Sequence, residues 1–301
     1  MRVLLIFIDG FGLGFNNPET NPLARFGLPS VEELFGLPLT QESGIIIKSD
    51  RCLIPIDATL GIEGLPQSAT GQAALLTGVN TASIMGRHIQ AFPGPCLAKI
   101  ITEHNLMKKL AMLGLAATSA NLYLPNYFEL VAMRKRRHSA ITLAALSTGM
   151  SLRSLAEIQN GYAVYQDITN ELLPEFGVAT VPVISPQQAA QNLVNISRKY
   201  SFTIFEYFQT DRAGHKQNWQ AAQSILGVLN EFIGWTYKLL PGDTFLLITS
   251  DHGNFEDMSV KTHTLNKVPL IALGSGVQNI VSNISDLTGI APSIIEALTK
   301  G

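Results

Sequence analysis

Short apolar runs alternate along the chain with longer amphipathic stretches. Five runs of almost unbroken apolar character are typical of parallel strands covered on both faces. These runs lie at residues 2–8, 116–122, 202–208, 244–250 and 268–274. Stretches with helical periodicity lie between and after them, at residues 69–78, 103–114, 185–200, 219–240 and 291–300. This alternation predicts βαβ units in an α/β fold with a doubly wound, mostly parallel sheet and helices on both faces.

The stretch 124–184 breaks this rhythm. It holds a basic cluster, residues 134–137, followed by a run rich in Ala, Leu and Ser. We expect a core domain formed by 1–123 and 185–301, with 124–184 inserted as a small cap over the edge of the sheet.

Composition limits the partners that the protein can have. Hydrophobic residues make up 46% of the chain, charged residues 15%, and the formal net charge is -2. No overall basic field is present to hold nucleic acid or anionic lipid. We expect the cluster 134–137 to form a solvated turn, with attraction of a substrate phosphate as the less favoured alternative. No apolar run is long enough to span a bilayer. Cys52 and Cys96 have no metal-type spacing, and we expect a cytoplasmic protein.

Chemically useful side chains collect where the predicted strands end or begin. Ligands of open α/β sheets bind beyond the carboxyl ends of the strands. The candidates at these positions are three aspartates and three histidines: Asp9, Asp211, His215, Asp251, His252 and His263. Each alone could be a helix cap or a buried structural histidine, but all six together favour a site that binds borderline divalent metals. Six ligands suit two metal ions about 3.5–4 Å apart, the arrangement of two-metal phosphatases.

A nucleophile for such a site is available at the start of the alanine-rich helix. The stretch "GLPQSATGQAALLTG" places Ser68 at the helix N-terminus, where free backbone N–H groups bind phosphate. A metal-bound hydroxyl is activated because its pKa falls. Thr70 offers a second hydroxyl nearby, and spacing alone does not choose between the two.

The ordered set of motifs resembles the alkaline phosphatase superfamily, closest to the branch of cofactor-independent phosphoglycerate mutase and phosphopentomutase. The resemblance rests on "IFIDGFG", "PQSATGQ", "DRAGH", "SDHGNFED", "THTLNKVPLI" and "LTGIAPSIIEAL". It implies an alkaline-phosphatase-like fold, a small phosphorylated substrate and two divalent metal ions, Mn or Zn, with Mg also compatible.

The resemblance also implies a role for each matching residue. Ser68 aligns with the hydroxyl nucleophile of the family. Asp9, Asp251 and His252, with the Ser68 oxygen, are similar to the ligands of one metal. The ligands of the second metal correspond to Asp211, His215 and His263. Gln67 stands where the mutases carry Asn or Asp, and we treat Gln67, Thr70 and Arg87 as candidate substrate contacts, since an arginine can clamp phosphate with two hydrogen bonds.

We therefore expect a two-metal phosphatase, acting on monoesters or diesters through a phosphoserine intermediate. The short stretch between Ser68 and Asp211 leaves room only for a small cap, which favours release of phosphate. A phosphosugar or phosphoglycerate-type mutase is the alternative within this class, because a mutase holds its intermediate under a lid.

Other classes of protein fit the sequence less well. A non-catalytic relative that keeps metals for stability would be expected to lose ligands, and here the full set is present. "LIFIDG" suggests a haloacid-dehalogenase-like phosphatase, but Phe11 stands where that chemistry needs a second aspartate. The glycines of "DGFGLG" do not form the dinucleotide-binding pattern.

Overall fold

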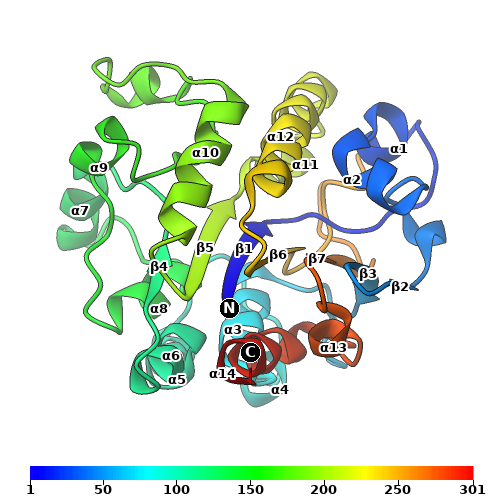
Figure 1. The fold of residues 1–301 in the computed structure, drawn as a ribbon, viewed down its shortest axis with the longest axis horizontal. Helices are drawn as coiled ribbons and strands as arrows, with labels where there is room; N and C mark the ends of the chain where they lie inside the picture. The colour runs from blue at the N-terminus through cyan, green and yellow to red at the C-terminus, as the bar shows by residue number, and fades with distance from the viewer. Residues whose placement is uncertain (301) are drawn as a thin grey trace.

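The computed structural model describes residues 1–300 and contains one seven-stranded sheet in the order β2-β3-β7-β6-β1-β5-β4 (Figure 1). Its strands are β1 (Arg2–Ile8), β2 (Ile46–Ile47), β3 (Arg51–Ile56), β4 (Ala117–Ser119), β5 (Phe202–Tyr207), β6 (Thr244–Thr249) and β7 (Val268–Leu273). β4, β5, β1 and β6 are parallel neighbours. β7 runs antiparallel to β6, β3 to β7, and β2 to β3. The predicted α/β class with a mostly parallel sheet is confirmed. The run 268–274 was expected to be a parallel strand, and this was wrong: apolar character on both faces shows burial but does not fix the direction of a strand.

Strands β2 and β3 were not predicted, and Pro55 explains part of this. A proline within an apolar run argues against a strand, because it cannot donate to the ladder. In the sheet Pro55 lies opposite Pro269 on β7. β2 pairs only with Cys52 and Leu53, and β6 only with residues 271–273 of β7. Both prolines therefore lie where no further strand needs an amide hydrogen.

Helices cover both faces of the sheet (Figure 1). One face carries α3 (Ser68–Thr77), α4 (Thr81–Met85), α5 (Pro95–His104), α6 (Leu106–Met112), α8 (Ala140–Leu146), α13 (Gln278–Val281), η3 (Leu287–Gly289) and α14 (Ile290–Lys300). The other carries α1 (Pro22–Phe26), α2 (Pro29–Phe35), α10 (Pro186–Ser197), α11 (Gln209–Lys216) and α12 (Trp219–Leu239). The helix predicted over 103–114 is divided at Asn105, whose side chain accepts a hydrogen bond from the Lys108 amide at 3.0 Å and caps α6.

Two large apolar cores result from the alternation of side chains along the central strands. On β1, Val3, Leu5 and Phe7 pack toward α3 and α14. Leu4 and Ile6 pack toward α10 and α12. The helices thus hold β1 from both sides, and its carboxyl end opens at the centre of the sheet edge.

The stretch 124–184 contains α7 (Pro125–Ala132), α8, α9 (Leu155–Gln159) and the short 3₁₀ helix η2 (Leu173–Phe176). A third, smaller apolar cluster forms in and beside it: Leu122, Leu124, Ile158, Ala163, Tyr165, Leu173, Val178 and Val181. α8 instead joins the core beneath α3 and α5. The division into a core domain and a cap at 124–184 stays a prediction.

Within residues 1–300, no helix has both the length and the apolar character needed to cross a membrane.

Replacing Phe205 on β5 with alanine tests the importance of the α10–α12 core. Phe205 is fully buried, and its ring centroid lies 5.4 Å from that of Phe232 on α12. We expect Phe205→Ala to lower the free energy of unfolding by about 3–5 kcal/mol, measured by urea denaturation. The control Phe15→Ala removes a ring that is 67% exposed and should change stability by less than about 0.5 kcal/mol. Equal effects would contradict this account of the core.

Candidate metal centre

The six predicted ligands converge at the carboxyl edge of the sheet. Asp9 follows β1, and Asp251 and His252 follow β6. Asp211 and His215 lie one turn apart on α11, which follows β5 directly, and His263 lies in the loop before β7. The six residues that the sequence placed at strand ends therefore lie close together in the structure.

The first group of ligand atoms surrounds the Nε2 atom of His252. The Ser68 Oγ lies 3.0 Å from this nitrogen, an Asp9 carboxylate oxygen 3.3 Å and an Asp251 oxygen 3.7 Å. Asp251 and His252 are fully buried. The Oδ1 of Asp9 is also buried and accepts no hydrogen bond from residues 1–300. An unpaired buried carboxylate oxygen beside an imidazole nitrogen fits a bound cation.

The second group is formed by Asp211, His215 and His263. The Asp211 oxygens lie 3.4 Å from the Nε2 of His215 and 3.6 Å from that of His263, and the two Nε2 atoms are 3.3 Å apart. The Nδ1–H of His215 donates to the Lys261 carbonyl, and that of His263 donates to the Pro66 carbonyl, both at 2.7 Å. Both Nε2 lone pairs then face Asp211, which is the orientation of metal-binding histidines.

The two groups adjoin. The rings of His252 and His263 are stacked with centroids 3.7 Å apart. Asp211, His252 and His263 also have ligand atoms within 4.8 Å of one another. Cations held by the two groups would therefore be neighbours in one centre.

Burial and repulsion between like charges disfavour the ionised forms of Asp251 and Asp211 and the protonated form of His263. Burial, together with the nearby Asp9 carboxylate, raises the pKa of Asp251 to about 8 and that of Asp211 to about 6. Burial, together with His252, lowers the pKa of His263 to about 4. Divalent cations would reverse the shifts of the two aspartates, since they favour ionised carboxylates. They would act in the same direction as the shift of His263, since they favour a neutral imidazole.

Helix α3 packs tightly against the first group. A Cβ atom on Gly71 would lie 2.8 Å from the backbone oxygen of Asp251, so only glycine allows this approach. The side-chain nitrogen of Gln72 donates to an Asp251 carboxylate oxygen at 3.2 Å and to an Asp9 carboxylate oxygen at 3.5 Å. The small residues of "SATGQAA" thus bring Ser68 against the carboxylates.

Glu256 joins the loops that carry the ligands, and its side chain is buried. Its carboxylate accepts hydrogen bonds from the amides of Gly12 at 3.1 Å and Asn254 at 2.8 Å. It also accepts from the Asn266 side chain at 3.0 Å and from the Thr264 hydroxyl. The loops after β1 and β6 and the one before β7 are therefore fixed to one side chain.

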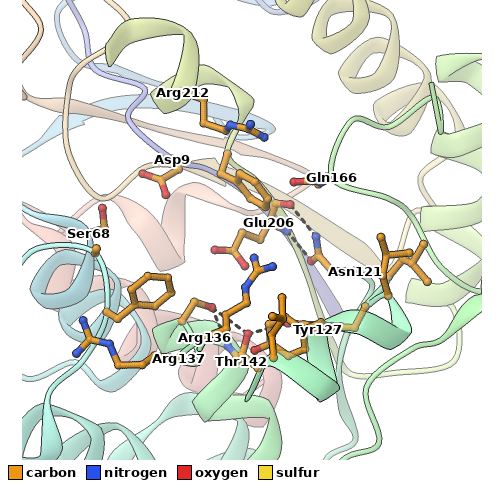
Figure 2. Close-up of a pocket in the computed structure, with 18 of the residues that line it drawn as sticks. Asp9, Ser68, Asn121, Tyr127, Arg136, Arg137, Thr142, Gln166, Glu206 and Arg212 are labelled. Carbon is orange, nitrogen blue, oxygen red and sulfur yellow. Dashed lines mark hydrogen bonds between the residues drawn. The ribbon is translucent and has the colours of Figure 1, made fainter. Parts of the chain in front are cut away.

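A cavity of about 420 Å³ opens beside the first group (Figure 2). Asp9, Ser68 and Asp211 line one end of it. Arg136 and Arg137 line the part formed by the stretch 124–184. All four residues of the basic cluster are exposed, as expected of a solvated turn, and the turn between α7 and α8 also directs two of them to the cavity.

None of the three predicted substrate contacts is among the described residues that line this cavity. The Thr70 hydroxyl is buried, donates to the Gln67 carbonyl at 3.2 Å and accepts from the Ile89 amide at 3.2 Å. Gln67 precedes α3 as its N-cap residue without a side-chain cap bond. Arg87 is exposed, and among the described residues neither it, Gln67 nor Thr70 lines the cavity. Ser68 is thus the hydroxyl that faces both the ligands and the cavity.

Sequence reasoning missed Glu206 on β5. It pairs with Phe7 of β1, so it projects to the same face as Asp9, and it lines the cavity. Burial, with the nearby carboxylates of Asp9 and Asp251, raises the pKa of Glu206 to about 8. The available signal was a single acidic residue within the otherwise apolar run "FTIFEYF".

The chain belongs to the Metalloenzyme superfamily, whose sequence profile matches residues 1–299. Among its relatives is the 2,3-bisphosphoglycerate-independent phosphoglycerate mutase of Ehrlichia ruminantium, 30% identical over 149 residues. The mutase of Mycoplasma genitalium is 30% identical over 140 residues. The matches cover 45% and 43% of this chain but only 29% and 27% of those enzymes. The expected metal-dependent class of enzyme is confirmed at the level of the superfamily.

Solved structures of similar fold include an alkaline phosphatase from the Antarctic bacterium TAB5, with a TM-score of 0.54 and 13% identity, covering 99% of this chain and 97% of that one. The PH0037 protein of Pyrococcus horikoshii has a TM-score of 0.52 and 15% identity, covering 100% and 97%. The alkaline-phosphatase-like fold expected from the motifs is confirmed.

Replacing Glu256 with glutamine tests its bracing role at nearly constant volume. The introduced amide hydrogens would face other donors, so we expect a loss of about 3 kcal/mol in the free energy of unfolding, measured in urea. Manganese affinity, measured by calorimetry, should weaken as well, because the ligand loops lose their common anchor. In the control Asp257→Asn, the altered carboxylate accepts hydrogen bonds from the neighbouring Ser259, and both quantities should stay near wild type. Unchanged stability of Glu256→Gln would contradict the bracing role.

Proposed function

We propose that the protein is a two-metal phosphoryl-transfer enzyme that hydrolyses small phosphate esters through a phosphoserine intermediate. The observation that carries the proposal is the position of the Ser68 Oγ, 3.0 Å from His252 Nε2 and on the wall of the cavity. Membership of the Metalloenzyme superfamily supports divalent metal ions, and we propose two, Mn or Zn, with Mg also compatible.

The proposed ligand sets follow the two groups described above. Asp9, Asp251 and His252, with the Ser68 oxygen, would hold one ion. Asp211, His215 and His263 would hold the other. When bound, divalent ions lower the pKa of a coordinated hydroxyl and stabilise the charge that develops on phosphoryl oxygens.

The chain's own contribution is a positioned nucleophile. Ser68 Oγ attacks phosphorus and loses its proton, the bond from phosphorus to the ester oxygen breaks, and the alcohol leaves after taking up a proton. Water then attacks the phosphoserine, which releases inorganic phosphate and restores the Ser68 hydroxyl. The N-terminus of α3, a helix of 10 residues, favours the phosphoryl charge throughout.

A mutase is the second candidate, because the relatives in Ehrlichia and Mycoplasma carry that name. The chain spans less than a third of their length. A mutase must retain its alcohol product until the phosphoryl group is returned, whereas the hydrolase needs only water. A non-catalytic, metal-holding relative is the third candidate and predicts no turnover with metals bound.

Replacing Ser68 with alanine should abolish turnover. We expect purified protein to hydrolyse p-nitrophenyl phosphate or its diester, to lose activity in EDTA and to regain it with Mn or Zn. Ser68→Ala should lower kcat by about a thousand-fold or more, as removal of a nucleophile does. The control Thr70→Val removes the other candidate hydroxyl, which is engaged by backbone groups, and should retain most activity. Undiminished activity in Ser68→Ala would exclude the proposed mechanism.

Hydrolase and mutase are separated by the fate of the phosphoryl group. In water enriched in oxygen-18, the hydrolase should release one labelled phosphate for each alcohol formed. A mutase with the same serine should instead form an isomeric phosphate ester without the label. Isomerisation without phosphate release would decide for the second candidate.

A further inference from the structure

The cavity has a largely aromatic wall, and Figure 2 shows Tyr127 among the residues that form it. Six aromatic side chains contribute to it: Phe92, Tyr123, Tyr127, Tyr165, Phe176 and Phe208. Leu122, Leu124 and Leu130 line the cavity as well. A phosphate ester of a small polyol would leave much of this apolar surface without a partner.

Two of these rings are held in place by hydrogen bonds. The Tyr123 hydroxyl lies 2.9 Å from the Thr142 hydroxyl, and the Tyr127 hydroxyl lies 2.7 Å from the Nδ1 of His138. The two tyrosine rings meet edge to face with centroids 5.0 Å apart. Rings that are already ordered lose little entropy when a ligand packs against them.

The polar side chains of the wall are mostly committed to the protein itself. The Asn121 side chain donates to the Glu206 carbonyl at 2.7 Å and accepts from the Glu206 amide at 2.9 Å. The Gln166 amide donates to the Tyr165 hydroxyl at 2.8 Å. Few neutral hydrogen-bonding groups are left to recognise a string of sugar hydroxyls.

Two arginines extend the aromatic wall. The Arg136 guanidinium lies 5.0 Å from the Tyr127 ring centroid, and that of Arg137 lies 5.4 Å from the Phe92 centroid. Within residues 1–300 neither forms a salt bridge. Planar guanidinium groups stack on aromatic rings as well as pairing with anions, so they suit a ligand that is both flat and anionic.

We propose that the cavity binds phosphate esters whose alcohol part carries a planar aromatic ring, such as aryl phosphates or nucleoside monophosphates. The phosphoryl group lies toward Ser68, and the ring packs against Phe92, Tyr127 and the two arginines. The placement of the phosphoryl group rests on the proposed function. The volume of the cavity, about 420 Å³, falls within the range of pockets that bind small molecules.

Binding to the Mn-loaded Ser68→Ala protein tests the inference apart from catalysis. Phenyl phosphate and adenosine monophosphate should each bind at least about tenfold more tightly than glycerol 3-phosphate in calorimetry, since stacking of one ring contributes about that much. A ring preference without any turnover by the parent protein would leave the inference standing and overturn the hydrolase. Turnover with equal affinity for all three ligands would overturn the inference alone.

Variants of the wall localise the preference. In the Ser68→Ala background, Phe92→Leu and Tyr127→Leu should each lower the ring preference at least about threefold, and Phe92, which is only partly buried, keeps the test valid if Tyr127→Leu does not fold. The control Tyr162→Leu removes a ring outside the cavity and should leave the preference unchanged. A preference that survives both wall variants would overturn the proposed location.

The arginines are tested in the same way. Arg137→Gln should weaken phenyl phosphate binding several-fold, whereas Arg134→Gln, in the same turn but outside the cavity lining, should not. Equal effects of the two substitutions would show a general charge effect and contradict a contact by Arg137.

Discussion

The central constraint on this molecule is that three carboxylates, Asp9, Asp211 and Asp251, share one small and largely buried volume. Loss of water on burial, together with repulsion from neighbouring carboxylates, raises the pKa of Asp211 and Asp251, so the chain alone stabilises their ionised forms poorly. Cations are the natural partners of such a cluster. The histidine Nε2 atoms face this cluster. The close packing at Gly71 and the hydrogen bonds of Glu256 keep the carboxylates near one another despite their mutual repulsion.

The sheet explains why this cluster can be built at all. β1 lies between β5 and β6, so the residues after three parallel strands reach the same edge. Each loop comes from a rigid strand packed on both faces, which limits the freedom of the ligand it carries. The cavity is then completed by the stretch 124–184, which contributes arginines and aromatic rings rather than ligands. Under the proposed function, the sheet and its loops would supply the chemistry, and the stretch 124–184 would contribute to selectivity.

The sequence was informative wherever function coincided with the end of an apolar run. Asp9 and the Asp251-His252 pair could be predicted because strand ends are visible in hydrophobicity, and parallel strands share one edge. Arg136 and Arg137 could not, because their direction is set by the turn between α7 and α8 and by contacts far away in the chain. β3 was hidden by Pro55, whose missing amide matters only if a further strand lies alongside. Glu206 was visible as the single acidic residue of an apolar run. Its position beside Asp9, however, follows only from the pairing of Glu206 with Phe7 in the sheet.

The order of the strands also bears on how the molecule assembles. β1, which begins near the N-terminus, pairs with β5 and β6, which follow much later, and Asp9 meets its partners only when these pairs exist. Contacts between such distant segments close large loops and form slowly. An incomplete chain emerging from the ribosome would expose β1 without either neighbour. Metal capture would accordingly be a late event in folding, because its ligands come together only when β1, β5 and β6 are paired.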